Sequence, residues 1–102
     1  ELQAPDGDWV AIEAKPNQLI VDSCDMMANL TNGQFRSTMH RVVNPPDLAK
    51  RRLSMPFFMH PTKDTDLTPL PACIESTSGE ADFPSWTAEE FLAKRLSEIG
   101  LG

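Results

Sequence analysis

The sequence has 102 residues, 40% of them hydrophobic and 24% charged, which is ordinary composition for one small globular domain. No apolar run approaches the roughly 20 residues of a membrane-spanning helix, so we expect a soluble, cytoplasmic protein without a membrane partner. The net charge of −6 disfavours a nucleic-acid partner, because phosphate binding requires clustered Lys and Arg. Cys24 and Cys73 are expected to be reduced thiols, with a single disulfide as the alternative.

The first third of the chain predicts two short strands and one short helix. Residues 9–12 and 19–21 are short runs rich in β-branched and apolar side chains, which favour strands. Residues 25–30 contain methionine, alanine and leucine and favour one or two helical turns, with Asp25 or Ser23 as a possible cap.

The middle of the chain predicts two further strands and a long connection. The turn signal Asn32-Gly33 precedes a strand at residues 35–43, and residues 51–59 are the longest strand candidate. Residues 60–86 are rich in proline, serine and threonine, and we expect them to be irregular.

The C-terminal residues 87–102 predict the clearest helix. Thr87 and Glu90 form a capping box, in which each side chain accepts a hydrogen bond from the other residue's backbone N–H. An apolar stripe follows along the helix, and Gly100 ends it. Because four or five short strands do not close a barrel by themselves, we interpret the chain as part of a sheet structure.

Alternation along residues 51–59 divides their side chains between two faces. One face is wholly apolar and is expected to pack on a hydrophobic layer: Leu53, Met55, Phe57 and Met59. The other face carries Arg52, Ser54, Pro56 and Phe58. If this second face is solvated, Arg52 and Ser54 have no special meaning. If it lines a cavity, Arg52 requires an anion, and a carboxylate bound bidentately with a third bond from Ser54 fits.

His40 lies on the strand predicted at residues 35–43, and a lone histidine is more often structural than a metal ligand. Its sequence neighbours change that expectation. The block T-N-G-x-F-x-S-x-x-H-R-V around His40 and the block R-x-S-x-P-F-F from Arg52 resemble the C-terminal part of the iron(II)/2-oxoglutarate-dependent dioxygenases. The branch that they resemble is the isopenicillin N synthase-like one.

The resemblance implies a role for four residues. His40 matches the distal histidine of an iron(II) site built from two histidines and one carboxylate. Arg52 and Ser54 match the pair that binds the C5 carboxylate of the cosubstrate 2-oxoglutarate, and Phe58 matches a position that often faces the small-molecule substrate. The implied fold is all-β: residues 1–86 are the C-terminal half of a double-stranded β-helix (jelly roll) with a trailing loop, and residues 87–102 are one C-terminal helix.

The sequence departs from the family in one large respect, because it has no H-x-D motif and no histidine before His40. We therefore expect a fragment of an oxygenase, inactive alone, whose partner is the missing N-terminal half of the parent protein or a second copy. Two other interpretations stay open at this stage. The chain could be a non-catalytic β-domain that binds a carboxylate, or an interaction module that pairs with another chain through open strand edges. The substrate's identity does not follow from the sequence.

Overall fold

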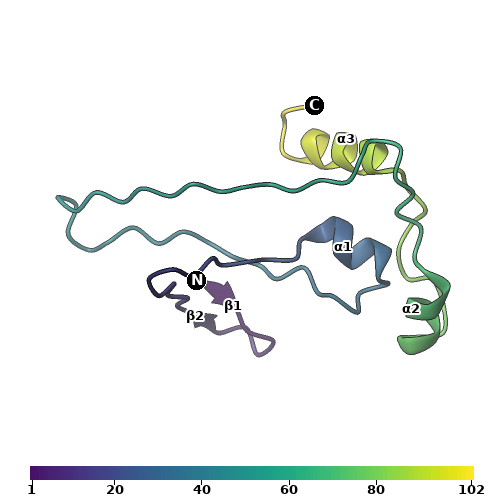
Figure 1. Cartoon of the computed structure of the whole chain (residues 1–102), viewed down its shortest axis with the longest axis horizontal. Helices are drawn as coiled ribbons and strands as arrows, with labels where there is room; N and C mark the ends of the chain where they lie inside the picture. Colours follow the sequence, from purple (N-terminus) through teal and green to yellow (C-terminus); the bar gives the residue numbers. More distant parts are fainter. The chain divides into compact units, whose positions relative to one another are not determined.

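The computed structural model describes residues 1–102 and contains two short strands and three helices (Figure 1). The strands are β1 (Leu2–Gln3) and β2 (Trp9–Val10), and the helices are α1 (Asp25–Leu30), α2 (Pro71–Ser76) and α3 (Ala88–Glu98). None of these helices is long and apolar enough to span a membrane. The chain divides into two compact units, which are residues 1–22 with 38–58, and residues 23–37 with 59–102. We name them unit 1 and unit 2.

Unit 1 is built around the antiparallel pair of β1 and β2, with Leu2 opposite Val10 and Gln3 opposite Trp9. A tight turn joins the two strands, and Gly7 lies in it with φ of +95°, a conformation that glycine adopts without a steric cost. Leu2 also forms an isolated bridge with His40. Beyond these contacts, residues 38–58 run as an extended trace with no strand arrows (Figure 1).

The expectation of an all-β half of a double-stranded β-helix is wrong for this chain. Its only sheet has two strands of two residues each, and most of the chain is coil. Residues 19–21 and 51–57 are not strands, and no backbone–backbone hydrogen bond joins them to another segment. The physical reason is that local preference can extend a backbone, whereas a strand also requires a hydrogen-bonded neighbour. This chain offers no such neighbour to these two segments.

The apolar face predicted on residues 51–59 is correspondingly uncovered. Leu53, Met55 and Phe57 are 87–88% exposed, and Leu19 and Val21 are 91–92% exposed. Unit 1 contains no buried residue at all. Since burying one such side chain is worth about 1.5–3 kcal/mol, these residues form a large unsatisfied apolar surface.

Unit 2 holds every buried residue of the chain. Its apolar centre includes Ala28 of α1, Leu67, and Ala88 of α3. Two backbone hydrogen bonds fasten the segment around Leu67: its N–H donates to the carbonyl of Trp86 at 2.7 Å, and Leu70 N–H donates to Leu30 at 3.0 Å. The connection at residues 60–86, expected to be irregular, therefore contains both a buried residue and the helix α2.

Two buried asparagines tie α1 and its C-terminal turn to distant parts of unit 2. The Asn29 amide donates to the carbonyls of Leu67 at 2.7 Å and Pro84 at 3.0 Å. The Asn32 amide donates to the Thr77 hydroxyl at 2.8 Å, and its oxygen accepts from the Asp82 N–H at 2.8 Å. Each such bond contributes about 0.5–1.5 kcal/mol, and losing one would leave a buried polar group without a partner.

Helix α1 has the predicted range, and α3 lies within the predicted residues 87–102 but ends at Glu98; the capping box is present with both of its bonds. Thr87 accepts from the Glu90 N–H, and the Glu90 carboxylate accepts from the Thr87 N–H at 2.8 Å. The predicted cap of α1 is wrong, because the residue at that position is Cys24, which makes no side-chain cap bond. The domain boundary predicted at residue 86 stays a prediction.

Candidate functional site

His40 is held in unit 1 by the backbone on both sides of it. The Gln3 N–H donates to the carbonyl of Met39 at 2.8 Å, and the Arg41 N–H donates to the carbonyl of Glu1 at 3.0 Å. These bonds belong to the bridge between His40 and Leu2, and they fix the backbone position of the histidine beside β1. The imidazole itself is 61% exposed.

The neighbouring Arg41 strengthens the same attachment. Its guanidinium contacts the Glu1 carboxylate through two nitrogens, each at 2.7 Å, and lies 4.0 Å from the centroid of the Trp9 ring. Both nitrogens approach the same carboxylate oxygen, and a hydrogen bond between two charged groups is stronger than one between neutral groups. The segment around His40 is therefore the best-anchored part of residues 38–58.

The His40 ring has two polar neighbours, and both approach the same nitrogen. Nδ1 lies 3.2 Å from the carbonyl oxygen of Thr38 and 3.3 Å from a carboxylate oxygen of Asp22. Asp22 belongs to the extended segment that follows residues 19–21, and its side chain is 31% exposed. Nε2 makes no hydrogen bond or ion pair within the chain.

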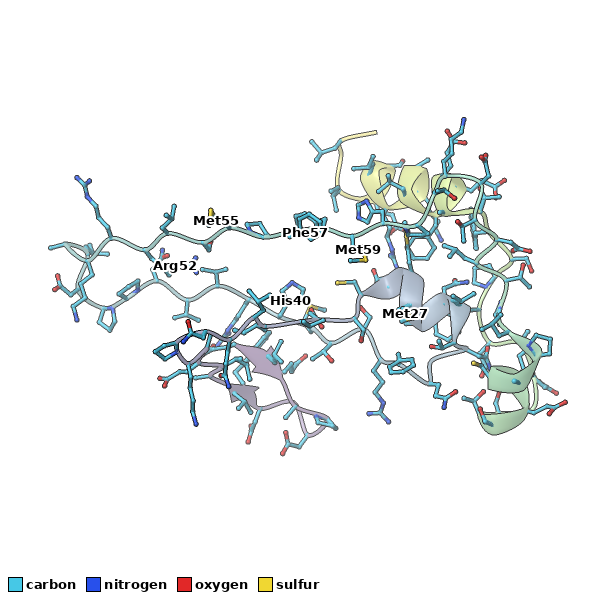
Figure 2. All side chains as sticks on the ribbon, viewed as in Figure 1. Met27, His40, Arg52, Met55, Phe57 and Met59 are labelled. Carbon is cyan, nitrogen blue, oxygen red and sulfur yellow. The ribbon has the colours of Figure 1, made fainter.

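Arg52 and Ser54, the predicted carboxylate-binding pair, are exposed on the extended segment of unit 1. Arg52 lines a shallow hollow of about 290 Å³ formed by the turn at residues 44–50. Figure 2 shows Arg52 nearer to this turn and His40 nearer to β1. Neither Arg52 nor Ser54 makes a side-chain hydrogen bond or ion pair, so the pair is available to a ligand. Phe58, the predicted substrate-facing residue, is 74% exposed.

The chain's own residues do not fit a complete iron site. Nowhere in it do three or more His, Cys, Asp or Glu side chains gather closely enough to hold a metal ion. His40 can supply one metal ligand, and the neighbouring Asp22 carboxylate contacts the Nδ1 side of its imidazole ring. Any iron held through His40 needs further ligands from outside these 102 residues.

Unit 2 contains a larger cavity, of about 460 Å³, that the sequence did not predict. Its walls combine aromatic rings with three cations and one acid: Phe83, Trp86, Phe91, Arg36, Lys94, Arg95 and Asp25. Two of the three cations, Lys94 and Arg95, have carboxylate partners within the chain. Arg95 lies 3.2 Å from the Asp25 carboxylate and 2.7 Å from that of Glu98, and Lys94 lies 3.6 Å from Glu98. The hydrogen bond from Arg95 lowers the pKa of Glu98 below its ordinary value. This arrangement does not concentrate positive charge for an anionic ligand.

Comparison with known proteins places the candidate residues in a family context. Residues 1–61 match the family model described as the 2OG-Fe(II) oxygenase superfamily, and this range includes His40, Arg52, Ser54 and Phe58. Among curated proteins, 92 residues are 38% identical to gibberellin 3-beta-dioxygenase 1 of Oryza sativa, covering 90% of this chain and 23% of the relative. The 1-aminocyclopropane-1-carboxylate oxidase 1 of the same species is 29% identical over 87 residues, which are 85% of this chain and 26% of the relative.

A solved structure also matches this chain in its three-dimensional fold. The crystal structure of a 2OG-Fe(II) oxygenase family protein from Caulobacter crescentus superposes on the chain with a TM-score of 0.87 at 40% identity. The match covers 96% of this chain and 33% of that one. The chain thus spans about a quarter of the length of the curated relatives and a third of the solved one.

Proposed function

The chain belongs to the 2OG-Fe(II) oxygenase superfamily, and on that premise we propose that it supplies the C-terminal part of an iron(II)- and 2-oxoglutarate-dependent oxygenase. The proposed reaction oxidises a small organic substrate with O₂, while 2-oxoglutarate loses CO₂ and becomes succinate. The observation that carries this proposal is the family match over residues 1–61, which includes both sequence blocks that bear the candidate residues.

The proposal gives each candidate residue a separate task. His40 provides one imidazole ligand for iron(II), and the remaining protein ligands come from polypeptide outside the chain. The Arg52 guanidinium binds the distal carboxylate of 2-oxoglutarate, with the Ser54 hydroxyl donating a further hydrogen bond. Phe58 lines the space for substrate. In support, Arg52 is an unpaired cation and Ser54 an unpaired hydroxyl two residues away, about 7 Å along an extended backbone.

The partner in this proposal is the rest of the parent protein, with a second copy of the chain as the alternative. Leu19, Val21, Leu53, Met55 and Phe57 are each at least 87% exposed, and the backbone beside them lacks hydrogen-bonded neighbours. Apolar side chains and unpaired backbone groups are satisfied together when another polypeptide lies against them. We propose that the chain by itself is inactive, because it supplies only one of the protein ligands that hold iron(II).

The test is binding of 2-oxoglutarate to the longer polypeptide that contains this chain, measured by calorimetry without oxygen, so that no substrate is required. Binding is expected with iron(II) present and is expected to fall to background when a chelator removes the metal. The 102-residue chain serves as the control and should bind no 2-oxoglutarate in either condition. Iron-independent binding, or no binding with iron(II), would contradict the proposal.

A further inference from the structure

The turn that ends α1 contains Asn32 followed by Gly33, a pair that is chemically reactive in an open chain. The backbone nitrogen of such a glycine attacks the side-chain amide carbon of the preceding asparagine, because glycine has no Cβ to obstruct the approach. A nitrogen–carbon bond forms, the bond from that carbon to the side-chain nitrogen breaks, and ammonia leaves behind a five-membered cyclic imide. Water then opens the imide to aspartate or isoaspartate. Asn32 is the only one of the four asparagines that precedes glycine.

The folded turn engages the nitrogen that would attack. Asn32 has φ of +51°, the left-handed conformation that commonly ends a helix. Its backbone N–H donates to the carbonyl of Asn29 at 3.2 Å, and the Gly33 N–H donates to that of Ala28 at 2.8 Å. The Gly33 nitrogen must lose its proton before it attacks, and in the fold that proton is held in a hydrogen bond.

The Asn32 side chain is held by three hydrogen bonds to residues 77–82. Its amide nitrogen donates to the Thr77 hydroxyl at 2.8 Å and to the Glu80 carbonyl at 2.9 Å. Its oxygen accepts from the Asp82 N–H at 2.8 Å. Asn32 is only 3% exposed, so water has little access to it. A rotation of the amide toward the Gly33 nitrogen would break these bonds.

We propose that Asn32 and Gly33 form a deamidation site that reacts only when this part of unit 2 opens, and whose products do not fit the turn. An aspartate at position 32 has no N–H to donate, and it brings a negative charge to the Glu80 carbonyl oxygen. Isoaspartate adds a methylene to the backbone and displaces the two bonds that end α1. The modification therefore converts a reversible opening into a permanent one. It goes beyond the proposed function and does not depend on it.

The conversion of Asn32 is followed by peptide mass spectrometry on the 102-residue chain, in mildly alkaline buffer with and without guanidinium chloride. In denaturant, Asn32 is expected to convert faster than Asn17, Asn29 and Asn44, the last of which precedes proline and so lacks an attacking N–H. Without denaturant, conversion should be at least about tenfold slower, since opening breaks several bonds that are each worth roughly two- to tenfold. Equal rates in the two buffers, or an Asn32 no more reactive than Asn17 in denaturant, would overturn the proposal.

The variant Thr77→Val removes one group that holds the Asn32 amide and keeps the size of the side chain. It is expected to raise the rate of Asn32 conversion without denaturant roughly two- to tenfold and to leave the rate in denaturant unchanged. Thr62→Val is the matched control, because the exposed Thr62 hydroxyl pairs with that of Thr65 at 2.9 Å, and its rates should equal those of wild type. Equal rates without denaturant for Thr77→Val and Thr62→Val would also overturn the proposal.

The effect of the product on the fold is tested with Asn32→Asp. In a Trp9→Phe background, Trp86 is the remaining tryptophan and its fluorescence reports on unit 2. Asn32→Asp is expected to unfold at a lower guanidinium chloride concentration than the background. Asn17→Asp makes the same charge change at an exposed asparagine and should leave the unfolding midpoint unchanged. Equal midpoints for the two variants would overturn the conclusion that the products do not fit the turn.

Discussion

Replacing His40 by alanine in the longer polypeptide is expected to reduce succinate formation from 2-oxoglutarate to background. The physical reason is that alanine offers no electron pair, and no other cluster of potential ligands in the chain can substitute for the imidazole. Because the side chain is 61% exposed in the chain and adds no buried contact there, its loss should not unfold unit 1. The measurement is succinate release with iron(II) and O₂ supplied.

The matched control for this variant is His60→Ala, which removes the other histidine of the chain. His60 is exposed and lies outside the two sequence blocks with predicted roles, so its replacement should leave succinate formation within about twofold of wild type. Equal activity of wild type and His40→Ala would show that the iron ligands all lie elsewhere.

Replacing Arg52 by lysine is expected to weaken 2-oxoglutarate binding strongly even though the positive charge is kept. A lysine ammonium cannot reproduce the planar two-point contact of a guanidinium with a carboxylate. Losing one charge-assisted hydrogen bond in an enclosed site costs roughly 1.5–3 kcal/mol. The apparent affinity for 2-oxoglutarate should therefore fall by about 10- to 150-fold, measured as the KM for 2-oxoglutarate in steady-state kinetics.

Arg51→Lys is the control for this effect, because alternation along the extended segment points Arg51 to the opposite face. Its KM for 2-oxoglutarate should be unchanged. Ser54→Ala should lose less than Arg52→Lys, about 0.5–1.5 kcal/mol for one neutral hydrogen bond. If Arg52→Lys and Arg51→Lys leave the KM equally unaffected, Arg52 lies on a solvated face and the cosubstrate assignment is wrong.

The parts of the structure that sequence predicted well depend on local signals. The helix at α3 follows from the capping box of Thr87 and Glu90, whose members are three residues apart and need nothing else. The helix α1 follows from the helical preference of Met26, Met27 and Ala28. The family resemblance, predicted from two short blocks, is confirmed by the match over residues 1–61.

The parts that sequence predicted wrongly depend on neighbours. Residues 19–21 and 51–59 have strand-like side chains, but whether an extended segment becomes a strand is decided by a second segment alongside it. The helix α2 was missed inside a proline-rich connection, although Pro71 occupies the first helical turn, where proline is favoured. Asn29 was missed as a structural residue because its two carbonyl partners are 38 and 55 residues away.

The candidate site follows the same rule: local sequence patterns identified its residues, whereas contacts between distant residues could not be predicted. His40, Arg52, Ser54 and Phe58 were identified by spacing within two blocks, and nothing in the chain alone brings them into one site. Asp22 belongs to neither block, and the structure puts its carboxylate against the His40 ring. That contact joins residues 18 positions apart, and sequence spacing carries no sign of it.

Titration of the 102-residue chain with iron(II) in the absence of oxygen, followed by calorimetry, tests whether the metal site is shared with polypeptide outside the chain. Three protein ligands normally fix a site of this type, and the chain offers only His40. We predict no saturable binding in the low micromolar range for the chain, and tight binding that depends on His40 for the longer polypeptide. A low-micromolar dissociation constant for the chain alone, lost in His40→Ala, would show that these 102 residues hold the metal without help and would contradict the proposal.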